Sequence, residues 1–378
     1  MAWLDALFNR MVDLNASDLH MSSTLQPMFR IHGDMHVVEG SEPISSERML
    51  EILTEIAPER NREEFAKEWD TDFAYAMPGS ARFRANYFMD RHGPGGVFRI
   101  IPTAIPTAKD LGLPKVITDF CRLPKGLVLV TGPTGSGKST TLAAMIDQIN
   151  NNRTEHIITI EDPIEFVHER KNCLINQREV HRHTTSFKRA LRAALREDPD
   201  VVLVGEMRDL ETIEIALETA ETGHLVFATL HTSTATSTVD RIIDQFPSER
   251  QAQVRTTLAS ALKGVVAMTL CKKVPTGRTA AFEILIVTNA VANNIREGKT
   301  HQIPSAMQTG GALGMRLLND SLLELVRAGQ VDPMEAYVKA IGKVDLVRKY
   351  QQAGIPFDES KVKGELDDPA VDRRATPR

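Results

Sequence analysis

The segment Gly132–Ser139 carries residue types at a spacing that could hold a chain of phosphates, because it fits G-x-x-x-x-G-K-S/T in full. Glycines let backbone N–H groups turn inward towards a phosphate without a Cβ in the way. Lys138 would neutralise phosphate oxygens, and the Ser139 hydroxyl would ligate Mg²⁺. The sequence therefore predicts binding of ATP with Mg²⁺. The residues predicted to bind are Gly132, Pro133, Thr134, Gly135, Ser136, Gly137, Lys138, Ser139 and Thr140.

Polar residues follow three predicted strands at the point where each strand ends. An acidic stretch from Glu161 to Glu165 follows the first, Glu206 follows the second after one glycine, and His231 follows the third. Ligands of a parallel α/β sheet bind beyond the carboxyl ends of its strands. We therefore expect these side chains at the edge where the phosphate loop lies.

Glu206 is the favoured catalytic acid, because phosphoryl transfer to water needs a carboxylate that orients the water and supports the metal. Glu165 is the second candidate, as a helper on the metal or on the water. The predicted metal ligands are thus Ser139, Glu165 and Glu206. His224 and His231 are candidates for sensing the γ-phosphate. For these acids and histidines the alternative is an ordinary solvated, core or capping side chain.

Short β-branched runs alternate with helical segments in the second part of the chain, which predicts an α/β fold with a mainly parallel sheet. The runs are Leu127–Val130, His156–Ile160, Val201–Val204 and Leu225–Thr229. The phosphate loop follows the first run, and a helix with one apolar face follows the loop. A further amphipathic helix is predicted over Phe187–Arg196, with a basic face that is either solvated or in contact with another subunit.

The first part of the chain is predicted to be a separate small α/β module. Leu4, Leu7, Phe8 and Met11 recur at helical spacing, and two hairpins are expected around His32–Asp34 and Pro78–Ser80. Prolines at 102, 106 and 114 indicate a linker. The predicted organisation is an N-terminal domain over 1–100, a linker over 101–115, an ATPase domain over 116–345 and a charged, disordered tail over 346–378.

Bulk composition excludes several classes of protein. The 378 residues carry a formal net charge of −5, which gives no reason to expect nucleic acid as a partner. The apolar runs are far shorter than the roughly 18 residues of a membrane span. The N-terminus has no basic leader typical of a secretory signal. Three scattered cysteines without a CxxC pair argue against a disulfide framework or a zinc site, so a cytoplasmic location is expected.

Four segments occur in the order found in secretion-type ATPases, which the chain resembles. They are Thr131–Thr140, Ile158–His168, Asp200–Asp209 and Thr222–Thr232. Within that superfamily the chain is similar to the type IV pilus retraction ATPases, the PilT family. The similar segments are Ala16–His20, Ala281–Ile284, Gly298–Pro304 and Ala290–Glu297, the last of which departs from the retraction motif AIRNLIRE at Val291, Ala292 and Asn294. Motors that assemble pili usually have a longer N-terminal extension and a tetracysteine zinc site. This chain has a short N-terminal module and no CxxC pair, so pilus retraction is favoured over pilus extension.

The resemblance implies a PAS-like N-terminal domain, a RecA-like P-loop ATPase domain and a ring of six subunits. It implies that ATP lies between the two domains of one subunit and next to a neighbour, where Arg82, Arg84 or Arg99 could stabilise charge on the γ-phosphate. The implied function is ATP hydrolysis that powers pilus retraction and twitching motility. The implied location is the inner face of the cytoplasmic membrane, with attachment only through the inner-membrane platform protein and the pilus machinery.

Four other functions remain open at this point. An accessory PilU-type retraction ATPase or a type II/IV secretion ATPase would differ in partner rather than in chemistry. A nucleic-acid translocase or RecA-like recombination protein is disfavoured by the acidic net charge and by the lack of a basic and aromatic patch. A regulatory ATP-binding module without turnover is disfavoured by Glu206.

Overall fold

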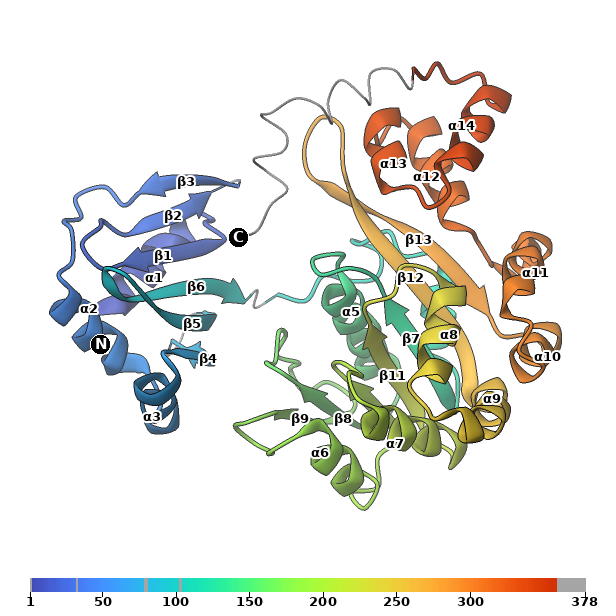
Figure 1. Cartoon of the computed structure of the whole chain (residues 1–378), viewed down its shortest axis with the longest axis horizontal. Helices are drawn as coiled ribbons and strands as arrows, with labels where there is room; N and C mark the ends of the chain where they lie inside the picture. Colours follow the sequence, from blue (N-terminus) through green and yellow to red (C-terminus); the bar gives the residue numbers. More distant parts are fainter. Residues whose placement is uncertain (1, 32, 78–80, 102–103, 359–378) are drawn as a thin grey trace. The chain divides into compact units, whose positions relative to one another are not determined.

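This computed structural model describes residues 2–31, 33–77, 81–101 and 104–358, which form two compact units (Figure 1). The first unit comprises Met1–Ile105 together with Glu161–His168, and the second comprises Pro106–Ile160 and Glu169–Arg378. The sequence prediction treated each domain as one continuous stretch. The grouping of Glu161–His168 with the first unit was not anticipated.

The first unit is an antiparallel sheet with helices packed on one face. Its strand order is β3-β2-β1-β6-β5-β4. The strands are β1 Asp18–Ser22, β2 Met28–Ile31, β3 Asp34–Val37, β4 Asp70–Ala76, β5 Arg82–Asp90 and β6 Gly93–Ile101, and the helices are α1 Trp3–Asp13, α2 Ser46–Ile56 and α3 Glu59–Glu68. Alternate strand residues such as Leu19, Ala85 and Phe98 pack with Phe8 of α1 in one buried core. The predicted N-terminal helix and both hairpins are confirmed, although His32 and the turn 78–80 lie outside the described residues.

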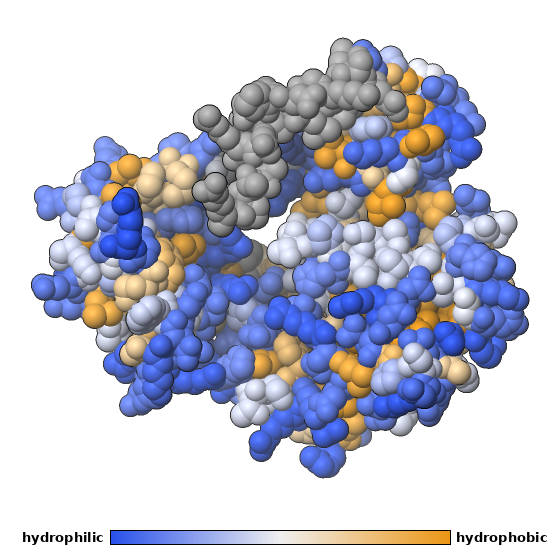
Figure 2. Space-filling model, in the orientation of Figure 1, coloured by the Kyte–Doolittle hydropathy of each residue, from blue (hydrophilic) through white to orange (hydrophobic). Residues whose placement is uncertain are grey.

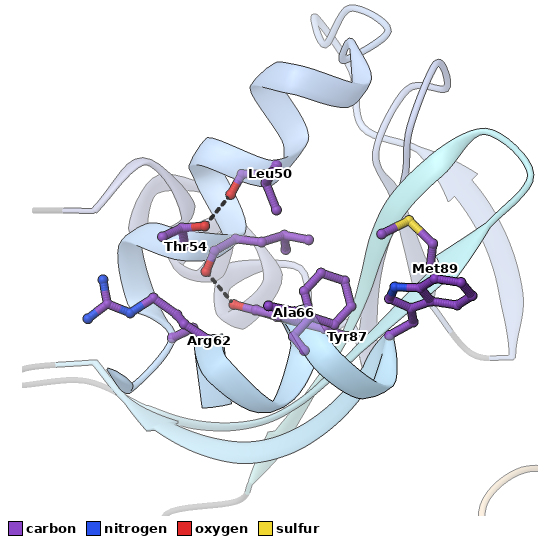
Figure 3. Close-up of a pocket in the computed structure, with 10 residues that line it drawn as sticks. Leu50, Thr54, Arg62, Ala66, Tyr87 and Met89 are labelled. Atoms are coloured by element: carbon purple, nitrogen blue, oxygen red, sulfur yellow. Dashed lines mark hydrogen bonds between the residues drawn. The ribbon is translucent and has the colours of Figure 1, made fainter. Parts of the chain in front are cut away.

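An apolar groove of ≈ 330 Å³ lies on the surface of the first unit (Figure 3). It is lined by Leu50, Leu53, Thr54, Ala57, Arg62, Phe65, Ala66, Trp69, Tyr87 and Met89. Two of its hydroxyl groups are used inside the fold: Thr54 Oγ1 donates to the carbonyl oxygen of Leu50 at 2.6 Å, and Tyr87 Oη donates to that of Leu53 at 2.9 Å. The groove therefore presents mainly hydrocarbon, with Arg62 and Met89 at opposite ends of the view.

The second unit is built on a sheet with strand order β13-β12-β7-β11-β10-β8-β9. The pairs from β12 to β8 are parallel, whereas β12 and β13 are antiparallel. The strands are β7 Gly126–Thr131, β8 His156–Glu161, β9 Leu174–Glu179, β10 Val201–Val204, β11 Leu225–Leu230, β12 Leu262–Lys272 and β13 Arg278–Ile286. The predicted α/β class, the mainly parallel sheet and the four predicted strands are confirmed. Strands β9, β12 and β13 were not predicted.

Helices cover this sheet and continue beyond its last strand. They are α4 Lys115–Phe120, α5 Lys138–Asn152, α6 Phe187–Ala194, α7 Leu210–Glu221, α8 Ala235–Asp244, α9 Ser248–Ala261, α10 Asn289–Arg296, α11 Ile303–Thr309, α12 Leu318–Arg327, α13 Pro333–Lys339 and α14 Lys343–Gln352. Short 3₁₀ turns lie at η1 Thr300–Gln302 and η2 Gly311–Leu313. The predicted helix over Phe187–Arg196 is α6, which ends two residues earlier.

The prediction of a disordered tail from residue 346 onwards is wrong for its first part. Leu346 and Tyr350 are fully buried in α14, and Tyr350 Oη donates to the carbonyl oxygen of Pro333 at 3.0 Å. These two residues are four positions apart and share one helix face. Charged residues between them make this apolar face difficult to recognise in the sequence. The helices α12, α13 and α14 form a cluster at the red end of the chain in Figure 1. Residues 359–378 lie outside the described part.

All three cysteines of the chain are free and buried. Burial raises the pKa of the Cys121 thiol to about 12 and that of Cys271 to about 11, and it also raises the pKa of Cys173. The surface seen in Figure 2 is largely hydrophilic with separate hydrophobic patches. Among the described residues, no helix has both the length and the apolar character needed to cross a membrane.

Replacing Leu346 by Ala is expected to destabilise the α12–α14 cluster by about 3 kcal/mol, because it removes a fully buried side chain from that cluster. Val344→Ala is the matched control in the same helix, since Val344 is 83% exposed. Hydrogen exchange of α12–α14 measures the difference. Equal exchange in both variants would show that this cluster does not depend on α14 packing.

Candidate functional site

Three neighbouring strands of the second unit end at one edge of the sheet. In the parallel ladders Leu230 of β11 pairs with Thr131 of β7, and Val204 of β10 pairs with Ala228 of β11. The backbone N–H of Gly132 donates to the carbonyl oxygen of Leu230 at 3.3 Å, which ties the start of the loop to β11. The register therefore brings the segments that follow β7, β10 and β11 to the same edge, as the sequence predicted.

The loop between β7 and α5 depends on glycine at two positions. Gly132 has φ +145°, and a Cβ there would lie 2.3 Å from the carbonyl oxygen of Met268 and 2.6 Å from Oγ of Ser136. Gly137 has φ +95° and caps the N-terminus of α5. Such conformations favour glycine strongly. The loop thus leads directly into a 15-residue helix whose N-terminal N–H groups and dipole favour an anion.

Two side chains of the loop bear on whether a phosphate fits it. Lys138 Nζ donates to the carbonyl oxygens of Gly132 at 2.8 Å and Pro133 at 3.1 Å, so the cation lies over the loop itself. Ser136 is only 3% exposed, and its Oγ has no hydrogen-bond partner among the described residues. A buried hydroxyl without a partner is costly. A phosphate oxygen would supply that partner, so the loop fits a phosphate group.

Glu206 sits on a turn that is fixed from both sides. The N–H of Gly205 donates to the carbonyl oxygen of Ile160 in β8 at 2.7 Å, and the N–H of Met207 donates to that of Thr229 in β11 at 3.1 Å. The Thr229 hydroxyl also donates to the carbonyl oxygen of Gly205. These bonds continue the sheet for one residue beyond β10. The carboxylate of Glu206 therefore emerges at a defined point of the sheet edge.

The carboxylate of Glu206 is held between two cationic or ionisable groups. Its Oε1 lies 2.7 Å from Nε of Arg208 and 3.0 Å from Nε2 of His231. Burial alone would raise the pKa of Glu206, but the hydrogen bond and charge of Arg208, aided by His231, outweigh it and lower that pKa. Glu206 is therefore ionised at neutral pH. The structure thus brings together Glu206 and His231, both of which the sequence singled out.

Arg208 was missed in the sequence. Its signal was its position two residues after Glu206, because residues i and i+2 of an extended segment point to the same side. Acids and histidines at the strand ends were predicted from the sequence, but Arg208, the cation that keeps Glu206 ionised, was not.

His224 does not lie at this edge. It precedes β11, whereas His231 follows it, so the six residues of β11, roughly 20 Å, separate them. Nδ1 of His224 is 3.0 Å from the carbonyl oxygen of Thr219, and its own carbonyl oxygen accepts from the N–H of Gly126 at the start of β7. His224 therefore lies at the end of β11 that is remote from the phosphate loop of its own subunit, and its role in sensing the γ-phosphate stays a prediction.

The three predicted arginines belong to the first unit. Arg84 of β5 lies opposite Arg99 of β6, and Arg82 lies two residues before Arg84 on the same strand. Nε of Arg99 is 2.7 Å from Oδ1 of Asp18, and Nε of Arg84 is 3.6 Å from Oδ1 of Asp72. Acidic partners thus offset the repulsion between like charges on neighbouring strands. The role of these arginines at a phosphate remains a prediction.

The predicted metal ligands come from both units. Ser139 is the second residue of α5, and Glu206 follows β10, whereas Glu165 is exposed in the segment that groups with the first unit. Within the described residues no group of three or more His, Cys, Asp or Glu side chains could hold a metal ion. A hydroxyl and a carboxylate are suitable oxygen ligands for Mg²⁺, which usually keeps waters and phosphate oxygens as its other ligands.

The chain is similar to known proteins over most of its length. The family model described as type II/IV secretion system protein matches residues 2–335. The chain is 53% identical over 325 residues to the type IV pilus retraction ATPase PilT of Pseudomonas aeruginosa, covering 86% of this chain and 94% of that protein. It is 50% identical over 315 residues to a twitching motility protein of Neisseria gonorrhoeae, covering 83% and 84%. A crystal structure of the pilus retraction motor PilT with bound ADP matches with TM-score 0.86 and 43% identity, covering 92% and 99%.

Replacing Arg208 by Gln is expected to raise the pKa of Glu206, because it removes the charge and the hydrogen bond that outweigh burial. A pH titration of the Glu206 carboxyl by NMR measures the shift. Arg122→Gln is the control, since Arg122 is an exposed arginine of the same unit that pairs with Asp119. An unchanged titration of Glu206 in Arg208→Gln would show that this ion pair does not set its charge.

Proposed function

Because the chain belongs to the family of type II/IV secretion system proteins, we propose that it is an ATPase that powers retraction of type IV pili. The observation that carries the proposal is the loop after β7, whose buried Ser136 hydroxyl, glycine backbone and helix N-terminus suit a phosphate group. The similarity to a retraction ATPase and to a twitching motility protein supports the direction of the motor.

The residues of the site then have distinct tasks in ATP hydrolysis. Lys138 turns from the loop carbonyls to the β- and γ-phosphates and neutralises them. Glu206, ionised beside Arg208 and His231, orients the attacking water, and His231, which pairs with Glu206, senses the γ-phosphate. Ser139, with Glu206 and Glu165 as helpers, would hold Mg²⁺, which supplies positive charge to the phosphate oxygens when bound.

The finer features of the motor are part of the same proposal. Six subunits form a homohexameric ring, with ATP bound next to a neighbouring subunit. Arg82, Arg84 or Arg99 of the first unit stabilises the charge that develops on the γ-phosphate. The ring acts at the cytoplasmic side of the inner membrane, attached through the platform protein of the pilus machinery.

Glu206→Gln should bind ATP but hydrolyse it about 10²- to 10⁴-fold more slowly, because the amide cannot act as the base. Lys138→Ala should lose both binding and turnover, since it removes the main cation of the loop. Calorimetric titration and phosphate release measure the two properties. Glu211→Gln, an exposed acid of α7, is the control and should behave as wild type. Normal turnover by Glu206→Gln would refute its assignment.

The helix α10 is expected to couple the ring to the pilus machinery without acting on ATP. Val291 and Ile295 are fully buried, whereas Arg296 is exposed and Asn294 is half-buried. Replacing Asn294 or Arg296 by Ala should leave the ATPase rate and hexamer formation nearly intact while twitching falls sharply, because a mechanical step can fail while chemistry continues.

The measurement compares ATPase rate, sedimentation and twitching in the same variants. Ile295→Ala is the control for a packing defect, since it should lower stability and all three readouts together. Normal twitching in Arg296→Ala and Asn294→Ala would contradict the coupling role, and a joint loss of all activities would make the segment structural.

A further inference from the structure

The segment Ala281–Ile284 was singled out in the sequence, but the proposed chemistry gives its acid no task. Glu283 lies in β13 and is only 7% exposed. Carboxylates are almost never buried without partners. Burial raises the pKa of Glu283, while hydrogen bonds from two backbone N–H groups oppose that rise. Because burying a carboxylate is energetically unfavourable, we expect Glu283 to have a role in the fold or in the motor.

The two oxygens of Glu283 serve the N-termini of two different helices. Oε1 accepts from the N–H of Ala235, the first residue of α8, at 2.8 Å, and Oε2 accepts from the N–H of Leu318, the first residue of α12, at 3.3 Å. Helix α8 has its own cap in Thr234, whereas the N-cap residue of α12, Leu317, makes no side-chain cap. Glu283 therefore supplies the side-chain acceptor that the N-cap residue of α12 does not, and it joins that helix to α8.

Helix α8 is connected directly to the phosphate site. The hydroxyl of Thr238 in α8 lies 3.5 Å from that of Thr131, the residue before Gly132. It also lies 2.7 Å from the hydroxyl of Thr232, which follows His231. Helix α8 thus contacts the residue before the phosphate loop and the residue after the histidine that pairs with Glu206.

Helix α12 is in turn attached to the edge strand and to the C-terminal cluster. Ile284 and Arg316 exchange two backbone hydrogen bonds at 2.8 and 3.0 Å, and the N–H of Phe282 donates to Oγ of buried Ser321 at 3.0 Å. The core of the cluster comprises Cys271, Ala281, Leu318, Leu322, Val331, Ala336, Leu346 and Tyr350. A shift of the N-terminus of α12 would therefore move packed helices rather than one loose loop.

We propose that Glu283 is a positioning residue whose carboxylate links α8 to α12 and thereby transmits the state of the phosphate site to α12–α14. The inference deepens the proposed ATPase function and rests on it. The competing explanation is that Glu283 only caps α12 and contributes stability. The two explanations differ in whether α12 responds to nucleotide, because coupling requires an element that both sites bias.

Hydrogen exchange of the full chain, with and without the nucleotides ADP and AMP-PNP, separates the two explanations. In the wild type, nucleotide should slow exchange at residues 132–140 and also change exchange at residues 231–238 and 318–327. Glu283→Gln keeps the shape of the side chain but leaves only one oxygen acceptor. Its amide NH₂ group faces the other backbone N–H, so that donor loses its partner. This variant should keep the nucleotide effect at 132–140 and 231–238 and lose it at 318–327. Glu283→Asp, which is too short to reach both helices, should behave alike.

Two control variants each loosen one helix without breaking the link. Ser321→Ala removes the acceptor that ties α12 to Phe282, and Thr234→Ala removes the cap of α8 on Ser237. Both should speed exchange locally with and without nucleotide, yet the nucleotide effect at 318–327 should persist. A purely structural role of Glu283 would make Ser321→Ala and Glu283→Gln indistinguishable.

The link is overturned if the nucleotide effect on exchange at 318–327 survives in Glu283→Gln. It is also overturned if this effect disappears equally in Ser321→Ala, or if the wild type lacks it although nucleotide protects 132–140. In each of these cases the proposed ATPase function stands. A wild type in which nucleotide leaves 132–140 unprotected would instead overturn the proposed function and the link together.

Discussion

The register of the parallel ladder is the constraint on which the rest of the site depends. Leu230 opposite Thr131, and Val204 opposite Ala228, bring the ends of β7, β10 and β11 to one edge. A shift of a single residue would turn every side chain of a strand to the opposite face. The side chains on both faces of these strands are closely packed in the core, so a shifted register would replace each of them by one of a different shape. The position of Glu206 relative to the phosphate loop is therefore a property of the hydrophobic core rather than of the loops.

Two carboxylates in the second unit show how environment decides charge. Glu206 meets a guanidinium and an imidazole, so its pKa falls although the group is partly buried. Burial raises the pKa of Glu283, although hydrogen bonds from two backbone N–H groups oppose that rise. The first environment suits a group that must stay ionised beside phosphates. The second suits a group that holds two helix ends, because its two oxygens are both occupied.

The sequence predicted the parts of the fold that have strong local signals. The runs Val201–Val204 and Leu225–Thr229 are continuous stretches of β-branched, aliphatic and aromatic residues, and both proved to be central strands. Strands β12 and β13 were missed because small and polar residues, such as Gly264 and Glu283, interrupt them. His224 precedes the strand in the sequence, so chain order alone places it at the end of β11 opposite to His231. The link through Glu283 needs two helices that are 83 residues apart at their first residues, a relation that no local pattern contains.

Because its three cysteines are buried, movements of this protein can be followed with dyes attached to introduced cysteines. Thiolate, not thiol, attacks a maleimide or a disulfide, and a raised pKa together with burial keeps Cys121, Cys173 and Cys271 in the unreactive form. A dye attached to one introduced surface cysteine would therefore report on that position alone. The native chain needs no prior removal of thiols from its core, so labels on α8 and α12 can be placed without disturbing the packing that connects them.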